Sequence, residues 1–346
     1  MSWILNGLRK KIEECIHDKI EGKNVKVIDI PTKIKRPEEI DVEKIEKEVY
    51  KEAKNASYDR SKGILDIHSN GVEFGISIED AKKIIQEEKE EYTIPLQITT
   101  PQVTIDMLGE DAFPNMLSNF STRYDASDKN RARNIELASE AINGKVFMPG
   151  EVFSFNTVVG PTTKAKGYMP AGAYSGGKLV QDYGGGVCQV SSTLYNTVLL
   201  ANLEIVERYN HSSVVGYVAP GRDATISYGT RDFKFANPRK YAIKINARAT
   251  NGILEMEIKG IAQDDDVEIE LSSEKTETIL CDTKYVYDSS LAEGQEVVET
   301  WGANGAKSIA YKTVKKNGRV ISKTVLSEDS YNPMVKVVRT GTKNKK

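Results

Sequence analysis

The sequence predicts an α+β protein that consists of a leader helix and three ordered parts. These parts are a small α+β unit at residues 25–105, a larger α+β domain at residues 106–267 and a small all-β module at residues 268–346. Helical and strand periodicities alternate irregularly up to about residue 265, and only strand and turn patterns follow. With 346 residues, of which 39% are hydrophobic, the chain is long enough to bury two or three cores.

The first 105 residues predict a leader helix and a compact α+β unit. Residues 1–24 have an amphipathic pattern, which fits a helix docked on the body or a trimmed juxtamembrane segment. Asp41 then opens a helix whose inward-facing residues are expected to be Val42, Ile45, Val49 and Ala53. Asn70-Gly71 predicts a hairpin between strands at 63–68 and 71–76. The other expected elements are a strand at 25–30, a capped helix at 77–91 and a strand at 92–99.

The middle domain, residues 106–267, is richer in glycine and aromatic residues. Ser127 and Asp128 cap a predicted helix that ends at Gly144. Pro149-Gly150 predicts a hairpin over residues 147–155. Strand and loop are expected at residues 168–174 and 178–183, and further strands at 204–208, 224–227, 241–247 and 254–258.

The last part contains only strand and turn patterns, and Asn317-Gly318 marks a hairpin turn. Its strands are expected at residues 267–271, 276–286, 297–300, 307–314, 319–326 and 334–339. A basic tail at residues 343–346 is expected to be solvated. We see no catalytic constellation in this part, and we interpret Cys281, which has no histidine near it in sequence, as inert.

The stretch that organises the middle domain is residues 182–196, DYGGGVCQVSSTLYN. Three consecutive glycines have no side chains to pack, so they fit a sharp turn or a close approach of backbone N–H groups to a ligand. Apolar residues at Val190, Leu194 and Val198 predict that a helix follows. Cys188 therefore lies at or just before a helix N-terminus, where the dipole favours the reactive thiolate. We predict that Cys188 is a nucleophile.

Acyl transfer by a thiol also needs a base, an orienting group and oxyanion donors. His211 is the only histidine of the middle domain and follows Cys188 after one helix and one strand, so we expect it to be the base. Asp223 or Asp182 would orient that histidine, and we place Asp223 in the predicted site. The candidates for oxyanion stabilisation and substrate binding are Gly185, Gly186, Gln189, Ser191, Tyr183, Arg208, Tyr209 and Arg222.

Charge and composition exclude several other classes of function. Lys and Arg (48) nearly balance Asp and Glu (50), which gives no electrostatic reason to expect a nucleic acid partner. No apolar run is long enough to span a bilayer, and the first residues do not resemble a signal peptide. Three histidines spread along the chain do not suggest a metal site, and His68 is interpreted as structural. Three sparse cysteines make no disulfide framework, although a pairing of Cys15 with Cys281 stays open.

Several motifs now show a family resemblance. Residues from about 120 to 260 resemble the VanW family through MPGEVFSFN at 148–156, GGGVCQVSSTLYN at 184–196 and RYNHS at 208–212, with DATI at 223–226 and FAN at 235–237. Residues 25–105 look like the peptidoglycan-binding-like domain that often precedes VanW. Residues from about 270 to 342 look like the G-five module, through Gly294, Gly302, Gly305, Gly318 and Gly341.

The resemblance implies an exported Gram-positive protein that acts on peptidoglycan stem peptides and glycan, at the cell wall or the outer face of the membrane. Any membrane contact would be through an anchor outside this sequence. Some VanW-domain proteins are implied to be L,D-transpeptidases, in which a cysteine takes an acyl group from a tetrapeptide stem; Cys188 matches that role, and no cofactor is needed. The familiar L,D-transpeptidase signature has a His-Gly pair before its cysteine, whereas Gly185-Gly186-Val187 stands here. Shared chemistry would therefore mean convergence on another scaffold.

Two rival interpretations stay open. Ser175 and Lys178 form an S-x-x-K pattern like that of penicillin-binding enzymes, but the two glycines between them disfavour the helix that this motif needs. The other rival is a non-catalytic peptidoglycan-binding or adhesion scaffold, in which the glycine run only shapes a turn. If the protein is an enzyme, the sequence leaves open whether the acyl acceptor is an amine or water.

Overall fold

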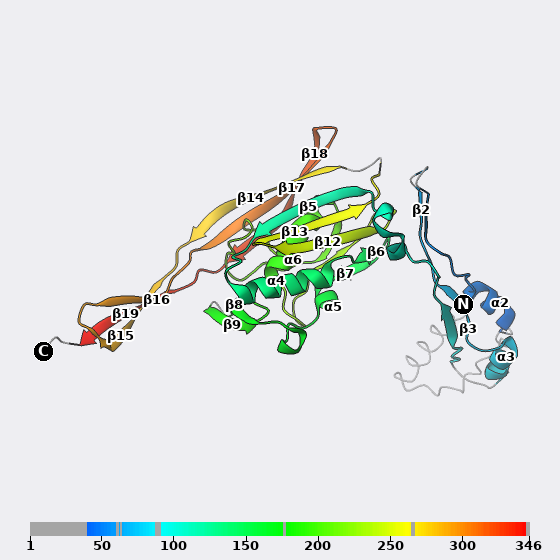
Figure 1. The fold of residues 1–346 in the computed structure, drawn as a ribbon, viewed down its shortest axis with the longest axis horizontal. Helices are drawn as coiled ribbons and strands as arrows, with labels where there is room; N and C mark the ends of the chain where they lie inside the picture. The colour runs from blue at the N-terminus through cyan, green and yellow to red at the C-terminus, as the bar shows by residue number, and fades with distance from the viewer. Residues whose placement is uncertain are drawn as a thin grey trace, which may run out of the picture. The chain divides into compact units, whose positions relative to one another are not determined.

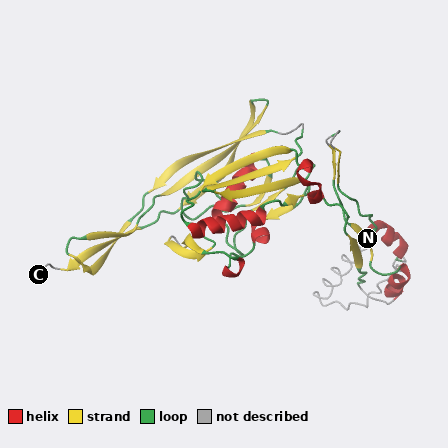
Figure 2. Cartoon of the chain, viewed as in Figure 1, coloured by secondary structure: helices red, strands yellow, loops and turns green. Residues whose placement is uncertain are grey.

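The computed structural model describes residues 40–59, 62, 64–86, 91–175, 178–263 and 267–343 (Figures 1 and 2). The predicted helix at 1–24, the strand at 25–30 and the last three residues of the basic tail lie outside the described residues. The chain divides into two compact units, one within Met1–Val49 and Phe74–Leu96 and the other within Tyr50–Glu73 and Gln97–Lys346.

The first unit contains the two predicted helices. Helix α2 spans Val42–Val49 and α3 spans Ile78–Gln86. Asp41 caps α2 by accepting a hydrogen bond from the Lys44 N–H at 3.1 Å, and Ser77 caps α3 by accepting one from the Asp80 N–H at 3.1 Å. Because α2 ends at Val49, Ala53 lies outside the helix, contrary to the sequence prediction.

The predicted hairpin around Asn70-Gly71 is wrong. Strand β2 (Ile64–Asp66) pairs with β1 (Ser57–Asp59), whereas β3 (Gly71–Phe74) pairs with β4 (Leu96–Thr99). Gly71 is needed for close backbone approach, because a Cβ there would lie 2.9 Å from the backbone nitrogen of Ala53.

A four-stranded antiparallel sheet with the order β5-β13-β12-β6 forms the centre of the second unit. Its strands are β5 (Asn115–Arg123), β6 (Val146–Phe147), β12 (Ile243–Thr250) and β13 (Ile253–Gly260). Helices α4 (Lys129–Ile142) and α6 (Val187–Leu200) pack against this sheet (Figure 1). The Asp128 side chain caps α4 and Gly144 follows its end at φ +77°, as the sequence predicted.

A second sheet, with the order β10-β11-β7, corrects two predictions. It contains β7 (Val152–Ser154), β10 (Glu204–Glu207) and β11 (Lys234–Ala236). Because β6 belongs to the central sheet and β7 to this one, residues 147–155 are not a hairpin; the Gly150 N–H instead donates to the Asn237 carbonyl at 2.7 Å. Residues 224–227 are not a strand either: they lie in the long loop between β10 and β11. Strands β8 (Pro170–Ser175) and β9 (Lys178–Tyr183) form an antiparallel pair, where the sequence predicted strand and loop. The remaining helical segments are α5 (Phe155–Val159) and two 3-10 turns, η1 (Ile105–Ala112) and η2 (Lys164–Lys166).

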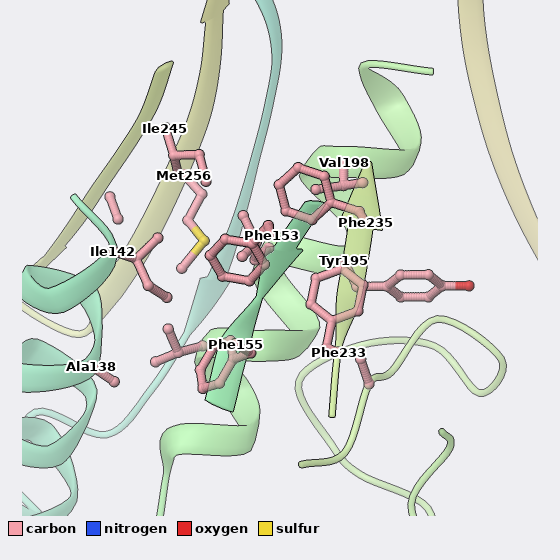
Figure 3. Close-up of a cluster of buried hydrophobic side chains, with 14 of the residues drawn as sticks. Ala138, Ile142, Phe153, Phe155, Tyr195, Val198, Phe233, Phe235, Ile245 and Met256 are labelled. Carbon is pink, nitrogen blue, oxygen red and sulfur yellow. The ribbon is translucent and has the colours of Figure 1, made fainter. Parts of the chain in front are cut away.

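Aromatic side chains fill the space between the helices and the two sheets (Figure 3). Phe153 and Phe235, from neighbouring strands, stack with their ring centroids 4.9 Å apart. Tyr195 of α6 meets Phe233 edge to face at 5.6 Å. These contacts fix the position of α6, whose residues from Gln189 to Leu199 are all buried. The polar face of α6 is therefore buried too, although the sequence pattern indicated an amphipathic helix.

The C-terminal part is all β, as predicted, and most of its strands are longer than the pattern indicated. The single strand predicted at 276–286 is wrong, because one strand ends at Ile279 and the next begins at Thr283. One sheet contains β14 (Glu268–Ile279), β17 (Gly305–Lys316) and β18 (Arg319–Tyr331); the other contains β15 (Thr283–Ala292), β16 (Glu296–Thr300) and β19 (Lys336–Lys343). Asn317 and Gly318 have positive φ values of 51° and 72°, which confirms the predicted turn between β17 and β18. Leu271 and Leu326 pack against the core that contains α6, so β14 and β18 share that core.

Candidate active site

The glycine run places Cys188 in the first turn of α6. Gly184 and Gly186 have φ values of +87° and +109°, which L-residues with side chains rarely adopt. Gly185 passes so close to β8 that a Cβ there would lie 2.6 Å from the Ala171 carbonyl oxygen. Helix α6 begins at Val187 with Gly186 as its N-cap. The predicted position of Cys188 at a helix start is confirmed.

The thiol of Cys188 is only partly buried. Its sulfur lies 3.7 Å from Thr225 Oγ1 and 3.6 Å from the Ile226 carbonyl oxygen. Both residues belong to the loop between β10 and β11, which also carries His211 and Asp223. Cys188 is therefore a partly exposed residue whose sulfur faces the loop that bears the other predicted site residues.

His211 and Asp223 form a close pair in that loop. The Nδ1 atom of His211 lies 2.6 Å from Asp223 Oδ2, and the backbone N–H of His211 donates to the same oxygen at 2.7 Å. Because an ionised carboxylate only accepts hydrogen bonds, Nδ1 carries the hydrogen and Nε2 is the atom left for proton transfer. Tyr217 meets the ring edge to face, with its hydroxyl 3.4 Å from Nε2.

Cys188 and His211 interact directly and shift each other's pKa. Burial on its own raises the pKa of the Cys188 thiol, but hydrogen bonding and charge attraction from His211 lower it below its ordinary 9.0. Burial likewise lowers the pKa of His211, but Asp223 and Cys188 together raise it from 6.5 to about 9. At pH values above the lowered pKa of Cys188 and below about 9, the pair favours a thiolate and an imidazolium, which is the reactive state of a cysteine–histidine pair.

Asp223 is completely buried and is held by four hydrogen bonds. Besides the two from His211, Oδ1 accepts from Arg208 Nη2 at 3.1 Å and from the Tyr331 hydroxyl at 2.5 Å. Burial raises the pKa of Asp223, but its bonds to His211, Arg208 and Tyr331 outweigh that effect and keep the pKa below 3.8. Asp223 rather than Asp182 lies against His211; the Asp182 side chain is exposed and accepts from the Tyr183 N–H.

Several residues predicted to bind substrate have structural contacts instead. Gln189 is buried and bonded to Thr122 Oγ1 and the Arg123 carbonyl, and Ser191 is buried and donates to the Ala224 carbonyl at 2.6 Å. Arg208 is covered by Asp223 and Asp329, so its guanidinium is not open to a substrate carboxylate. Arg222 donates to Asn196 and lies over the Phe120 ring. The sequence placed these polar residues near the cysteine, but it did not show that both sides of α6 are covered.

The remaining predicted residues lie at the surface or in the glycine turn. Tyr183 and Tyr209 are 38% and 41% exposed, so their rings are accessible. The Gly185 N–H donates to the Asp182 carbonyl at 3.3 Å. In the described part of the chain, the N–H groups of Gly186 and Cys188 meet no acceptor, and both belong to the N-terminal turn of α6.

Sequence reasoning missed four residues of this site: Tyr217, Thr225, Asp329 and Tyr331. Tyr217 and Thr225 occur in the loop that carries the predicted pair, so a search for polar residues near His211 and Asp223 would have included them. Asp329 and Tyr331 lie in the all-β part, where no local pattern indicates a role in the site.

Other candidate features do not form sites. Ser175 and Lys178 are paired on β8 and β9, so the helical S-x-x-K arrangement is absent here. Cys281 is a free thiol, and Cys15, whose pairing with Cys281 the sequence left open, lies outside the described residues. No group of three or more potential metal ligands occurs among the described residues, and no described helix is long and apolar enough to cross a membrane. Depressions of about 260 and 360 Å³ lie elsewhere, and neither is lined by Cys188 or His211.

Comparison with known proteins identifies two domains. Residues 130–259 match the family described as VanW like protein, and residues 270–343 match the G5 domain. The Uncharacterized protein YoaR of Bacillus subtilis (strain 168) is 43% identical over 159 residues, which are 46% of this chain and 52% of that protein. The Vancomycin B-type resistance protein VanW of Enterococcus faecalis (strain ATCC 700802 / V583) is 34% identical over 144 residues, 38% of this chain and 52% of that protein. The chain thus spans about half the length of the curated relatives it matches.

Two solved G5 structures are also similar to the C-terminal part. The IgA1 protease G5 domain is 23% identical and covers 24% of this chain and 99% of its own, with a TM-score of 0.17. The HP0197-G5 crystal structure is 25% identical and covers 21% of this chain and 99% of its own, with a TM-score of 0.14. Because both TM-scores are low, the assignment rests on the family matches and the curated relatives. The chain therefore contains a VanW-family domain at residues 130–259, followed by a G5 domain at residues 270–343.

Proposed function

We propose that this protein cross-links peptidoglycan by cysteine-dependent acyl transfer of the L,D-transpeptidase type, through a thioester on Cys188. The VanW and G5 domains suggest a cell-wall-associated function, which we place outside the membrane. The observation that carries the enzymatic proposal is the arrangement of a partly accessible Cys188, a histidine that lowers its pKa, and a buried Asp223 that holds that histidine. These are the parts that thiol-based acyl transfer requires.

In the first half-reaction, the Cys188 thiolate attacks the carbonyl carbon of the last peptide bond of a tetrapeptide stem. A C–S bond forms and the carbonyl oxygen becomes an oxyanion. When the C–N bond breaks, the leaving amine takes the proton from His211 Nε2, so that a thioester and a neutral imidazole remain. Asp223 keeps this imidazole in the tautomer with hydrogen on Nδ1.

In the second half-reaction, an amine of another stem attacks the thioester. The neutral Nε2 of His211 accepts the proton of this amine, the new C–N bond forms and the C–S bond breaks. Cys188 leaves as a thiolate and His211 is again an imidazolium, which restores the starting state. Attack by water in place of the amine would give a carboxypeptidase, and the balance depends on how well the bound stems exclude water.

Backbone N–H groups at the start of α6 are the proposed oxyanion donors. Those of Gly186 and Cys188 are without an acceptor among the described residues, as expected for the first turn of a helix. Donors at this position act on the charge that develops on the carbonyl oxygen. Gly185, which the sequence also suggested, uses its N–H within the turn.

The test is product formation from stem tetrapeptide and an amine acceptor with the purified full chain, measured by mass spectrometry. We expect Cys188→Ala to abolish the cross-linked product. Cys281→Ala is the matched control, because Cys281 is a free thiol of the G5 domain and should leave the product unchanged. Full product from Cys188→Ala would exclude the thioester route, and loss in Ser175→Ala instead would revive the S-x-x-K interpretation.

A second candidate function is non-catalytic binding to the cell wall. Large aromatic side chains of the G5 domain are exposed: Tyr285 by 58%, Tyr287 by 80% and Trp301 by 75%. Tyr285 and Tyr287 alternate on β15 and therefore point to the same face, as residues of a contact surface would. This function predicts that purified cell wall binds the wild type and Cys188→Ala equally and binds Tyr287→Ala less. It also predicts that none of the three proteins forms cross-linked product.

A further inference from the structure

The buried side of the candidate site continues from the VanW domain into the G5 domain. Tyr331, the last residue of β18, is fully buried. Its hydroxyl donates to Asp223 Oδ1 at 2.5 Å and accepts from the Gly221 N–H at 2.7 Å. Asp329, on the same face of β18, accepts two hydrogen bonds at 2.8 Å from Nη1 of Arg208. One strand of the G5 domain thus contacts both residues that support the histidine.

The charges of this cluster are balanced through Arg208. Its guanidinium lies between Asp223 and Asp329, and the three side chains are 9%, 0% and 7% exposed. If Arg208 faced Asp223 alone, it would offset the carboxylate charge that stabilises the His211 imidazolium. Asp329 gives Arg208 a counter-ion of its own, so the charge of Asp223 remains available to His211.

We propose that β18 of the G5 domain completes the candidate active site, with Tyr331 and Asp329 as positioning residues for Asp223 and Arg208. The inference rests on the proposed function, since the site that it completes is the proposed acyl-transfer site. It means that the VanW domain is not catalytically self-sufficient. The G5 domain then contributes residues that the active site of the enzyme needs.

The competing explanation is that β18 only attaches the two domains to each other. Several contacts would serve either role: Asn332 N–H donates to the Ser212 carbonyl at 2.7 Å, and Ser327 Oγ donates to the Gly221 carbonyl at 3.2 Å. An attachment needs these hydrogen bonds, but it does not need a buried negative charge next to Arg208. Removing that charge therefore separates the two explanations.

The first test is Asp329→Asn in the full chain, with an NMR titration of the His211 ring. The groups that face His211 are Asp223, Cys188 and Tyr217, and behind Asp223 lie Arg208, Tyr331 and Asp329. Without the Asp329 charge, Arg208 offsets Asp223, so we expect the pKa of His211 to fall from about 9 by roughly one unit. His68, which accepts from the Ile105 N–H, serves as an internal reference.

The matched control for this charge removal is Asp288→Asn. Asp288 also pairs with an arginine of the G5 domain, Arg339, at 2.7 Å, but that pair joins β15 to β19. It should leave the His211 pKa at the wild-type value. A shift of the same size in both variants would mean that any lost ion pair perturbs the histidine.

The second test, Tyr331→Phe, removes one hydroxyl and keeps the buried ring. Because Tyr331 is fully buried and cannot touch a substrate, we expect kcat for stem-peptide transfer to fall by about tenfold while KM is unchanged. Tyr311→Phe is the control, since Tyr311 belongs to β17 of the same sheet and lies under Lys323. It should leave both constants unaltered.

The inference is overturned if both variants fold and keep the wild-type His211 pKa and kcat. If Asp329→Asn does not fold, Tyr331→Phe decides by the same two measurements. The NMR titration needs no substrate, so it also separates this inference from the proposed function. Product from Cys188→Ala together with a shifted His211 pKa in Asp329→Asn would refute the reaction and keep the positioning role.

Discussion

The thiol half and the imidazole half of the candidate site are built in different ways. The thiol half is one continuous stretch, in which Gly184–Gly186 turn the chain and α6 begins at Val187, one residue before Cys188. The imidazole half comes from separate segments: Arg208, His211, Asp223 and the end of β18. Backbone sterics fix the first half, and buried hydrogen bonds and charges fix the second. We therefore expect substitutions in the two halves to have different effects.

The largest effect is expected in the imidazole half, for Asp223→Asn. The neutral amide cannot hold the His211 imidazolium, so alkylation of Cys188 by iodoacetamide at pH 7 should slow by about 10² or more. Asp182→Asn is the matched control, because Asp182 is exposed and bonds only within its own turn. Equal rates in the two variants would remove Asp223 from the site, and thermal unfolding shows whether each variant is folded.

A somewhat smaller effect is expected for His211→Ala. Loss of the imidazole leaves burial as the main influence on Cys188, so the pKa of the thiol should rise to 9.0 or above. At pH 7 such a thiol is only about 1% ionised, so alkylation should be slow and should rise about tenfold per pH unit between about pH 5 and 8, with no plateau in that range. The wild type should titrate at lower pH. His68→Ala is the control, since His68 accepts from the Ile105 N–H away from the site.

The same pair has a defined effect on stability. The pKa of His211 is raised from 6.5 to about 9, so its stabilising contribution is complete below pH 6.5 and is lost as the pH rises through about 9. The pKa of Cys188 is lowered from 9.0, so its contribution is present above pH 9.0 and is lost as the pH falls through its folded-state value. From pH 6.5 or the folded-state pKa of Cys188, whichever is higher, up to about pH 9, the folded and unfolded pairs bind the same number of protons. In that pH range the pair should therefore contribute little to the pH dependence of the midpoint of thermal unfolding. A comparison of the wild type with the Cys188→Ala/His211→Ala double variant would check this.

In the thiol half, Gly185→Ala should act through backbone position. The new Cβ would lie 2.6 Å from the Ala171 carbonyl oxygen, and backbone cannot move aside as a flexible side chain does. We expect a loss of about 1–3 kcal/mol in stability and a displaced Cys188. Gly216→Ala is the control, because a Cβ at Gly216 meets nothing within 4 Å. Lower unfolding temperature in Gly216→Ala alone would contradict this account.

The smallest effect is expected for Ser191→Ala, which separates a packing role from substrate binding. Ser191 donates to the Ala224 carbonyl, which Ser192 also reaches, so its removal should cost only about 1 kcal/mol. Activity per folded molecule should equal that of the wild type. A raised KM with unchanged stability would instead restore Ser191 to the substrate site.

The difference between the two halves also explains what the sequence could predict. The start of α6, the end of α4 at Gly144 and the turn at Asn317-Gly318 depend on local backbone physics, and all three were predicted correctly. Both wrong hairpins, around Asn70-Gly71 and Pro149-Gly150, came from real turn signals. A turn signal says where the chain bends, but the partner of each strand is decided by segments far along the chain.

The site itself shows the same limit. Cys188, His211 and Asp223 were proposed from the sequence, and the structure brings them together. Arg208, Gln189 and Ser191 were assigned to substrate because they are polar and near the cysteine, whereas burial shows them supporting the fold. Tyr331 lies 108 residues beyond Asp223, in a domain with no local sign of a role, so only the fold reveals it.

The most direct test of the central claim is mass spectrometry of the full chain after incubation with a stem tetrapeptide, without an acceptor. We predict a covalent adduct on the peptide that contains Cys188, with a mass equal to the tetrapeptide less its terminal amino acid, and its loss on treatment with hydroxylamine. An adduct on another residue, or unmodified Cys188 with intact tetrapeptide, would contradict the claim.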